Sequence, residues 1–569
     1  MDFKTAKSIY NQMLSAYRQS QEPIDRDLQK FIDPTRGAFS TQENYSKKMD
    51  GQTLVDTVTI ESAEAFASGV MSFMTDPTKA WVKFEVQQAD QKNQVVIDYL
   101  AKVGTEIRRI ISGSNIYQEL LNLYAELAVF GRGVMVITRD LEKVIHAYFY
   151  TAGSYVIQKN AKNEIDSFAV TLKKTVAQLV DEFGIENVGA QVKDDFLNNS
   201  ISKYYDMIWL IIPNSSIQPS QLDHRGKKYS SLKWLVSRNN NDFLSVSGFD
   251  FFPVVCARYS PKDCTQIYGG KYPGWLSLSA SRQLQEQVRA GNRIDAFNSD
   301  PAIVTYGIDI EDIYPGASIP FDMGMAESSG NKYGVESIYP QRDSTYLEAK
   351  ADRQRDVIQR NFQVQFFQML SRIQDKSMTL GEVNMRYSEM VKAISPQIMS
   401  VESALHSMLD IIFHTLLSTW VIIDDSNMTL LESLCGPIPQ ELQDKDVSYK
   451  LIGVLSILQQ ASETLPDEQL VQFTTYLASA NQSDPINNPV DYLSFDEVLK
   501  GYANHIGRGE LLRGDDEVQK IRDARTQAYS QQQQQQDSQN AIKSAQAMAQ
   551  TPIAQNTALG AVMGQQGVI

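Results

Sequence analysis

The stretch YPGWLSLSASRQLQEQVRAGNRIDAFNSD, residues 272–300, predicts a long helix, and RDSTYLEAKADRQRDVIQRNF, residues 342–362, predicts a second one. At helical spacing one side of each helix carries the following residues: Leu284, Val288, Gly291 and Ile294 in the first, and Tyr346, Ala349, Arg353, Val357 and Arg360 in the second. Neither helix has an apolar stripe wide enough to bury it in an ordinary core. We therefore expect a helical hairpin that neighbouring copies of the chain complete.

Residues 301–341, between the two helices, are rich in Gly, Pro, Ile and Tyr. They cannot stay helical for long and predict a strand-forming tip. This tip has one basic residue, Lys332, and six acidic ones: Asp309, Glu311, Asp312, Asp322, Glu327 and Glu336. Six acids against one base leave five net negative charges, so a ring of such tips would be strongly acidic.

The length and charge of the chain limit what it can do. At 569 residues it is too long for a single core, so two to four domains are expected, and its 42% of apolar residues is typical of a globular protein. A net charge of -15 argues against tight, sequence-independent DNA binding, because phosphate contacts need clustered Lys and Arg, and no such block occurs. A nucleic-acid partner would be confined by shape rather than held by charge.

Three features predict a soluble protein made inside a cell. Cys256, Cys264 and Cys435 have no CxxC spacing and no nearby His, which favours buried thiols in a reducing compartment over a disulfide or a metal site. The N-terminal MDFKTAKSIYNQML lacks the apolar core of a signal peptide. The most apolar helix, residues 408–423, is interrupted by Asp410 and His414 and is too short for a bilayer, so no membrane association is expected.

Before the hairpin, the sequence predicts helices packed on a mostly antiparallel sheet. A polar helix in residues 1–50 should end near Pro34, a second helix should cover 54–74, and a third should cover 116–130 with Ser114 as its N-cap. Apolar or alternating runs predict strands at 133–138, 146–151, 155–159, 205–213, 228–237 and 252–260, with a hairpin turn at Asn239, Asn240 and Asn241.

After the hairpin, the pattern is mainly helical. A long helix should run from Glu382 to about Ile423, with a kink or break at Pro396 and an apolar face of Val401, Leu405, Met408, Leu409, Ile412, Leu416 and Trp420. Residues 449–480 should be helical with a break at Pro466. Residues 531–569 open with six Gln and have too few large apolar residues to fold alone, so they predict a tail or a polar helix in an assembly.

Motifs of known chemistry are missing from the sequence. There is no Walker A, HExxH, GxSxG or paired CxxC motif, and the Gly-rich turns at Gly131 and Tyr268 lack the spacing of a phosphate loop. We therefore expect no cofactor and no metal. An acidic hydrolase built on paired carboxylates such as Asp309 and Asp312 is an alternative, although nothing basic or strongly burying beside them would separate their pKa values.

The helices of the hairpin carry basic residues with two possible roles. Arg282, Arg289, Arg293, Lys350, Arg353, Arg355 and Arg360 could face DNA phosphates, or they could pair with acids on neighbouring helices, namely Glu286, Asp295, Glu348, Asp352 and Asp356. Because both signs alternate along each helix, pairing is the favoured interpretation.

A series of short motifs resembles the portal (head-to-tail connector) proteins of podovirus-like tailed phages. AEAFASGVMSFMTDPTKAW (63–81) and SNIYQELLNLYAELAVFGRG (114–133) are similar to two sequence patterns of that family. YGGKYPGW (268–275) and MTLGEVNMRYSEM (378–390) are similar to two further segments, with substitutions and an insertion. Each motif is weak alone, but their order over most of residues 10–465 is specific.

The resemblance implies an α+β, mainly helical portal fold. It implies a wing of helices plus antiparallel sheet at 1–271, stem helices at 272–300 and 342–362, a clip at 301–341, a channel loop region at 363–381, a long wing helix and return at 382–440, a crown at 441–530, and a Gln-rich barrel helix or disordered tail at 531–569. On this division the clip would dock partners through Asp309, Glu311, Asp312 and Glu327, and the channel loop would hold Gln374, Asp375 and Lys376 near DNA.

The implied function is that of a non-enzymatic ring of twelve copies at one capsid vertex. Such a ring is the conduit for genome packaging and ejection and carries double-stranded DNA through its channel. Its implied partners are the terminase, tail adaptor or head completion proteins, and the major capsid protein, and it would be assembled in the host cytoplasm. The alternative within the virion is another ring, such as a head–tail adaptor, although adaptors are usually much shorter.

Overall fold

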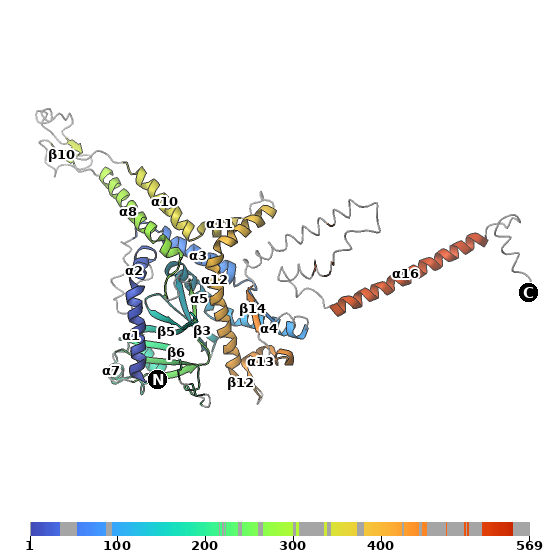
Figure 1. The fold of residues 1–569 in the computed structure, drawn as a ribbon, viewed down its shortest axis with the longest axis horizontal. Helices are drawn as coiled ribbons and strands as arrows, with labels where there is room; N and C mark the ends of the chain where they lie inside the picture. Colours follow the sequence, from blue (N-terminus) through green and yellow to red (C-terminus); the bar gives the residue numbers. More distant parts are fainter. Residues whose placement is uncertain are drawn as a thin grey trace, which may run out of the picture. The chain divides into compact units, whose positions relative to one another are not determined.

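The computed structural model divides into two compact units, Met1–Ser462 and Glu463–Ile569 (Figure 1). It describes residues 2–34, 54–86, 94–236, 242–259, 266–299, 343–372, 380–442, 447–451 and 515–549, with gaps of one or two residues inside some of these ranges, together with 303–305, 335–337 and a few single positions between 474 and 499.

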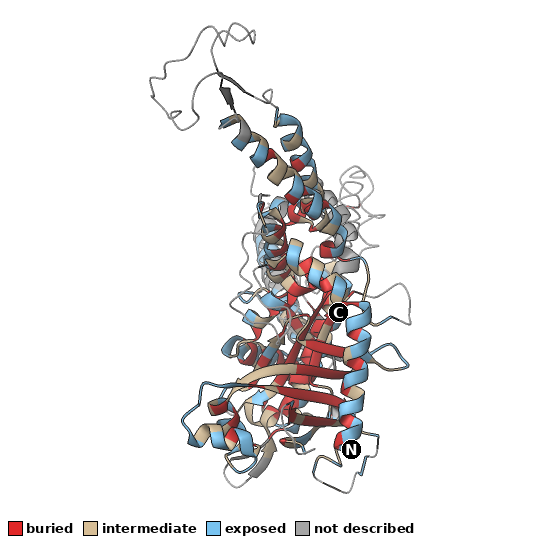
Figure 2. Ribbon diagram, turned by 90° about the vertical axis from the view of Figure 1, so that its left-hand side faces the viewer, coloured by how far each residue is buried: buried red, intermediate tan, exposed pale blue. Residues whose placement is uncertain are grey.

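Two helices, α1 (Phe3–Ser20) and α2 (Glu22–Phe31), replace the single N-terminal helix that the sequence predicted. Pro23 lies in the first turn of α2, and proline cannot donate the backbone hydrogen bond that would continue α1. The first helix therefore ends before Gln21 and a new one starts. Figure 2 shows α1, beside the N-terminus, lying across the strands of a sheet, against which it buries Phe3, Ala6, Tyr10, Met13 and Tyr17.

Two antiparallel sheets lie in the first unit, in the orders β4-β5-β6-β7-β8 and β3-β2-β9. Their strands are β2 (Arg132–Asp140), β3 (Val144–Tyr150), β4 (Tyr155–Lys159), β5 (Ile165–Thr175), β6 (Tyr204–Pro213), β7 (Tyr229–Leu235), β8 (Ser245–Phe249) and β9 (Val254–Arg258). Six of these strands were predicted. β5 and β8 were not, because β5 ends in polar residues and the SVSGF of β8 contains Ser and Gly, which are weak strand formers. The predicted hairpin turn at 239–241 lies outside the described residues.

β6 is buried on both faces. Because successive side chains of a strand point to opposite sides, alternate residues enter different cores. Ile208, Leu210 and Ile212 belong to the cluster under α1, whereas Trp209 and Ile211 belong to the cluster shared with the three-stranded sheet. This explains the continuous apolar run in the middle of the strand, and it joins α1 and the two sheets into one body.

The largest hydrophobic cluster is mainly helical. It contains residues of α3 (Val58–Met74), α4 (Gln94–Gly113), α5 (Ile116–Phe130), α12 (Leu380–Ser418) and α13 (Leu430–Cys435), together with one face of β2, β3 and β9. A two-stranded sheet of β1 (Val82–Val86) and β14 (Val447–Leu451) accompanies these helices. The predicted helices at 54–74 and 116–130 are confirmed, with α3 starting four residues later, whereas α4 was not predicted.

The predicted N-cap at Ser114 is wrong, because Asn115 holds that position in α5. The Asn115 side chain bonds the backbone of Ala147 in β3, donating to its carbonyl at 2.8 Å and accepting from its N–H at 3.0 Å. The Ser114 hydroxyl accepts from the N–H of Ile116 at 3.2 Å. The start of α5 is therefore fixed by a contact with a strand rather than by a local cap.

Of the kink or break predicted at Pro396, the break is wrong, because α12 continues through this residue. Its predicted apolar face, from Val401 to Leu416, is buried, and packing of such a face outweighs a local helix breaker. The helix ends at Ser418 instead of near Ile423. Trp420–Ile423 form β12, paired with β13 (Ser426–Thr429), as aromatic and β-branched residues favour.

The start of the helix predicted at 449–480 is wrong, because residues 449–451 belong to the strand β14. The rest of that range, Pro466 included, lies outside the described residues except for the helical Thr474. In the second unit α16 covers Asp515–Ala549, so the Gln-rich segment is helical to residue 549, and 550–569 lie outside the described residues. Shorter elements are α6 (Val176–Phe183), α7 (Ala190–Leu197) and η5 (Gln440–Leu442).

Two of the three cysteines fall in described segments, and both are unpaired. Cys435 is buried, and burial raises the pKa of the Cys256 thiol to about 11, so neither favours the reactive thiolate. Cys264 lies outside the described residues. Of the helices whose residues are described, none combines the length and hydrophobicity of a membrane span.

Candidate functional site at the root of the stem hairpin

Two long helices, α8 (Pro273–Ser299) and α10 (Thr345–Asn361), lie side by side as an antiparallel hairpin, called the stem hairpin here (Figure 1). At its root, Asn361 donates from Nδ2 to the Ser277 hydroxyl at 3.2 Å. At its far end, β10 (Ile303–Thr305) pairs with β11 (Val335–Ser337) in antiparallel register. The two predicted helices and the strand-forming start of the tip are therefore confirmed.

The buried face of α8 is polar at its root. Ser277 and Ser281 are fully buried and Gln285 nearly so, beside the fully buried Leu284. Ser281 donates from Oγ to the carbonyl of Phe31 at 2.6 Å, which satisfies a backbone acceptor at the end of α2. These small hydroxyl side chains let α8 approach its neighbours closely. Ser281 also hydrogen-bonds the end of α2, so it ties the two helices together.

Asp56, in the segment that leads into α3, connects both stem helices. The side-chain oxygen of Gln285 in α8 accepts from the N–H groups of Val55 at 2.7 Å and of Asp56 at 3.2 Å, and its Nε2 donates to the Asp56 carbonyl at 2.9 Å. From α10, Arg355 donates through Nε to Asp56 Oδ2 at 2.9 Å. The other carboxylate oxygen accepts from the N–H of Val58 at 3.0 Å, in the first turn of α3.

The start of α8 meets the end of α5 with no room for a side chain. A Cβ at Gly274 would lie 2.1 Å from the carbonyl oxygen of Val129. Two residues after Val129, Gly131 ends α5 in the left-handed region, at φ 71°, and a Cβ there would lie 2.3 Å from the Tyr272 ring. These two glycines fix the place where the stem leaves the core.

A buried ion pair lies beside this junction. The Asp25 side chain of α2 is 0% exposed and the Arg132 side chain of β2 is 4% exposed, and they are hydrogen-bonded. The hydroxyl of Tyr17 and the amide of Gln21 each donate to Asp25 at 2.9 Å, and the guanidinium lies 4.8 Å from the centre of the Tyr268 ring. Burial alone would lower the pKa of Arg132, but the Asp25 carboxylate raises it well above its usual value, so the guanidinium is charged although it is buried.

An aromatic contact anchors the chain after the stem. Gln363 has a positive φ of 57° and turns the chain from α10 into α11 (Val364–Arg372). The Phe367 ring then packs against α3, with centroid distances of 5.8 Å to Phe66 and 5.9 Å to Phe73. α11 is thus held against α3, the helix that follows Asp56.

Comparison with known proteins gives this arrangement a family. The model described as "Bacteriophage head to tail connecting protein" matches residues 4–510, which is most of the chain. The chain belongs to this family. The connector is 25% identical over 555 residues to the portal protein of Salmonella phage epsilon15, with 97% of this chain and 96% of the relative covered. It is 23% identical over 518 residues to the probable portal protein of Bordetella phage BPP-1, with 90% and 89% covered.

Solved structures similar to the connector are more distant. One is the virion of a native gene transfer agent particle, at 10% identity and a TM-score of 0.33, covering 81% of this chain and 91% of that one. Another is the neck of an empty gene transfer agent particle, at 10% identity and a TM-score of 0.31, covering 63% and 79%. These likenesses are too weak to carry an argument. The family match shows that the connector is a structural virion component associated with head and tail, not an enzyme. The helices and antiparallel sheets confirm the predicted α+β class.

The structure places some of the predicted stem residues in contacts within one subunit. Arg282 pairs with Asp27 of α2 at 2.5 Å, and Arg289 pairs with Glu286 of its own helix at 3.6 Å. Arg355 contacts Asp352 of its own helix at 2.5 Å in addition to Asp56. These three arginines therefore pair within their own helix, with α2 or with the segment before α3, and the predicted pairing between neighbouring helices stays a prediction.

The other stem residues lie on the outside of the hairpin. The ammonium group of Lys350 lies 4.3 Å from the centre of the Tyr346 ring, on the same helix. Arg293, Arg353 and Arg360 are exposed. The predicted clip residues Asp309, Glu311, Asp312 and Glu327 and the predicted channel-loop residues Gln374, Asp375 and Lys376 all lie outside the described residues.

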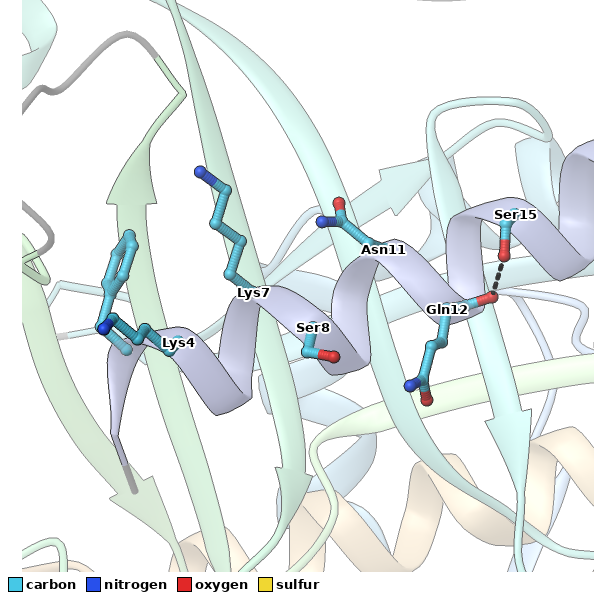
Figure 3. Close-up of a pocket in the computed structure, with 7 residues that line it drawn as sticks. Lys4, Lys7, Ser8, Asn11, Gln12 and Ser15 are labelled. Atoms are coloured by element: carbon cyan, nitrogen blue, oxygen red, sulfur yellow. Dashed lines mark hydrogen bonds between the residues drawn. The ribbon is translucent and has the colours of Figure 1, made fainter.

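The surface depression on α1 offers no catalytic constellation. A shallow depression on the outer face of α1 is lined by Phe3, Lys4, Lys7, Ser8, Asn11, Gln12 and Ser15. Figure 3 shows Lys7 and Asn11 projecting outward from the helix, and the Ser15 hydroxyl donates to the Gln12 carbonyl at 2.9 Å. This lining contains no carboxylate, histidine or cysteine. Throughout the described ranges, no group of three or more His, Cys, Asp or Glu could hold a metal ion.

Sequence reasoning missed Asp25, Arg132, Asp56 and Gln285. Arg132 stands in the quoted FGRG segment, which was interpreted only as a turn, and Gln285 follows a residue of the predicted face of α8. Asp25 and Asp56 gave no signal, because each looks like an ordinary polar residue near a helix start. Their partners are 107 and 229 residues away in the sequence.

Replacing Asp56 with Ala is expected to lower the free energy of unfolding by about 1–2 kcal/mol, because the half-buried contact with Arg355 and the hydrogen bond to the N–H of Val58 at the start of α3 are both lost. Asp352→Ala is the matched control. It removes the other carboxylate partner of Arg355, but that side chain is 69% exposed, so a loss below about 0.5 kcal/mol is expected. Urea unfolding followed by circular dichroism measures both variants. Equal losses would contradict the role given to Asp56.

Proposed function

We propose that the connector is the portal of a phage, a closed ring of identical copies at one vertex of the capsid. In this ring the stem hairpins surround a channel through which double-stranded DNA is packaged and later ejected. The tips dock the terminase during packaging and tail adaptor or head completion proteins afterwards, and the sheet-containing region contacts the major capsid protein. Assembly would take place in the host cytoplasm, and we expect twelve copies.

The observation that carries this proposal is the stem hairpin itself. Its inner face is tied to α2, α3 and α5 by buried serines, Gln285 and Asp56, whereas its outer face carries exposed charges on both helices. A pair of 27- and 17-residue helices with one face against the core and the other exposed is suited to packing against neighbouring copies. The two curated relatives, matched over 96% and 89% of their length, are a portal protein and a probable portal protein.

The division of the chain follows from the hairpin. We assign residues 1–271 and 382–440 to a wing, 301–341 to a clip, 363–381 to a channel loop region, 441–530 to a crown and 531–569 to a barrel helix or tail. The full-length match to portal proteins supports this function over a shorter adaptor ring. The charge of -15 per copy supports it too, because DNA passing a net acidic ring is repelled rather than held.

Electron microscopy of the purified protein tests the proposal. We expect rings with a central opening, and a protein that stays monomeric at every salt concentration would overturn it. Shortening the clip, by joining Thr305 to Val335 through a four-residue Gly-Ser turn, is expected to keep the rings and the α8–α10 hairpin while packaging of DNA into heads is lost. The strand pairing of β10 with β11 gives that turn a defined closure. Rings of the shortened variant that package DNA normally would contradict the docking role of the clip.

A further inference from the structure

The outer face of α8 carries charges in a fixed order. Arg282, Glu286 and Arg293 are exposed, and their spacing of four and then seven residues places them on one ridge of a helix with 3.6 residues per turn. The buried residues of the same helix, Ser281 and Leu284 among them, lie on the opposite side. From the root to the tip the ridge therefore has the signs positive, negative, positive.

The outer face of α10 carries the opposite order. Asp356 and Arg353 are exposed and lie about 60° apart around the helix, on the side opposite the buried Ala351 and Ile358. Two further exposed charges lie near them, Arg360 closer to the root and Asp352 at the edge of this face. From the root to the tip, Asp356 and Arg353 have the signs negative and positive. At these two levels the outer face of α10 is therefore the electrostatic complement of Arg282 and Glu286 on the outer face of α8.

The antiparallel register places these charges at similar heights along the stem. Ser277 and Asn361 are hydrogen-bonded and mark one level. Arg282 is five residues above Ser277, and Asp356 is five residues above Asn361, so both lie about 7.5 Å higher at 1.5 Å per residue. Glu286 and Arg353 are nine and eight residues above that level, which makes their heights equal to within about 1.5 Å.

We propose that α8 of one copy packs against α10 of the next copy, with Arg282 facing Asp356 and Glu286 facing Arg353. This inference rests on the proposed ring. Rotation about the axis of a ring leaves heights along that axis unchanged, so a hairpin that runs along the axis presents each α8 charge to the α10 charge at its own level. A shift by one charge would place like charges opposite each other, which fixes the register between copies.

The contacts within one subunit decide which pair gives the sharpest test. Arg282 already pairs with Asp27 of its own copy at 2.5 Å, so changing Arg282 would disturb a contact within the subunit as well as the one between copies. Glu286 contacts the neighbouring Arg289 at 3.6 Å, and its side chain is 75% exposed, which makes this contact weak. Exchanging the charges of Glu286 and Arg353 therefore changes the contact between copies with little effect on the fold of one copy.

The experiment compares four proteins by mass photometry and negative-stain imaging at about 0.1 M salt, where surface charges are only partly screened. The wild type is expected to form rings. Glu286→Arg and Arg353→Glu alone are each expected to lose at least tenfold in the ring fraction, because two like charges then meet at every contact, and circular dichroism should be unchanged. The double variant Glu286→Arg/Arg353→Glu is expected to recover rings.

Lys350→Glu is the matched control, since it reverses a positive charge on the same helix at a side chain that lies over its own Tyr346 ring. It is expected to keep the ring fraction. A double variant that remains unassembled, single variants that assemble normally, or an equal loss in the Lys350 variant would overturn the pairing while the ring itself stands. A wild type without rings would overturn the proposed function instead, so the two failures are distinguishable.

Discussion

Asp25→Leu is expected to destabilise the connector more than any other single change, by about 3–5 kcal/mol. It leaves the Arg132 guanidinium buried, charged and without its carboxylate, at a position where the side chain is 4% exposed. The Tyr17 hydroxyl and the Gln21 amide also lose their acceptor. The midpoint of urea unfolding, followed by circular dichroism, should fall accordingly.

The double variant Asp25→Leu/Arg132→Met separates two causes of this loss. Replacing both charges by apolar side chains of similar size removes the uncompensated ion, so most of the lost stability should return. If the double variant were as unstable as Asp25→Leu alone, the loss would come from packing at Asp25 rather than from the buried charge. Arg132→Met alone is expected to be nearly as harmful as Asp25→Leu, since it leaves the Asp25 carboxylate buried without its positively charged partner.

Gly274→Ala is expected to have the second largest effect, about 1–3 kcal/mol of lost stability together with a displaced stem. The new methyl group would lie 2.1 Å from a backbone oxygen of Val129, and a backbone atom at the end of a buried helix cannot move aside as a flexible side chain could. Urea unfolding measures the stability, and the ring fraction in electron micrographs measures the stem. Fewer rings are expected because every copy would present its hairpin at an altered angle.

Gly291→Ala is the matched control on the same helix. A Cβ at that position meets nothing within 4 Å in the subunit, and alanine favours a helix over glycine by about 0.8–1 kcal/mol. The control should therefore be as stable as the wild type or slightly more so. A Gly274→Ala variant that unfolds and assembles like Gly291→Ala would contradict the close approach of α8 to α5.

The parts of the fold that could be predicted are those that local periodicity determines. The stem helices follow from the spacing of residues such as Leu284 and Val288, and β6 follows from its apolar run. The course of the chain at Pro396 could not be predicted, because burial of the later part of α12 decides it. The strand at residues 447–451 has no local signal either, since its partner is residues 82–86 at the other end of the unit.

The candidate site was predictable as a place but not as a set of contacts. The hairpin was expected at residues 272–362, and the motif series indicated its family. The residues that fix its root act across the fold: Gln285 reaches the backbone of Asp56, and Arg132 reaches Asp25. Pairs separated by more than a hundred residues leave no periodic pattern in one sequence. Single polar residues of this kind are usually solvated, so sequence reasoning passes over them.

The hydrogen bonds at Asp56 have a mechanical consequence. α8 is packed on the core as far as Gln285, so only the rest of the helix, about 14 residues or 21 Å, projects beyond that contact. A sideways force on the tip produces its greatest bending moment where this projecting part meets the core, at the segment that Gln285 and Arg355 both contact. That segment leads into α3, and α3 also carries Phe66, which packs against Phe367 of α11, so the root of the stem and the start of α11 rest on the same helix.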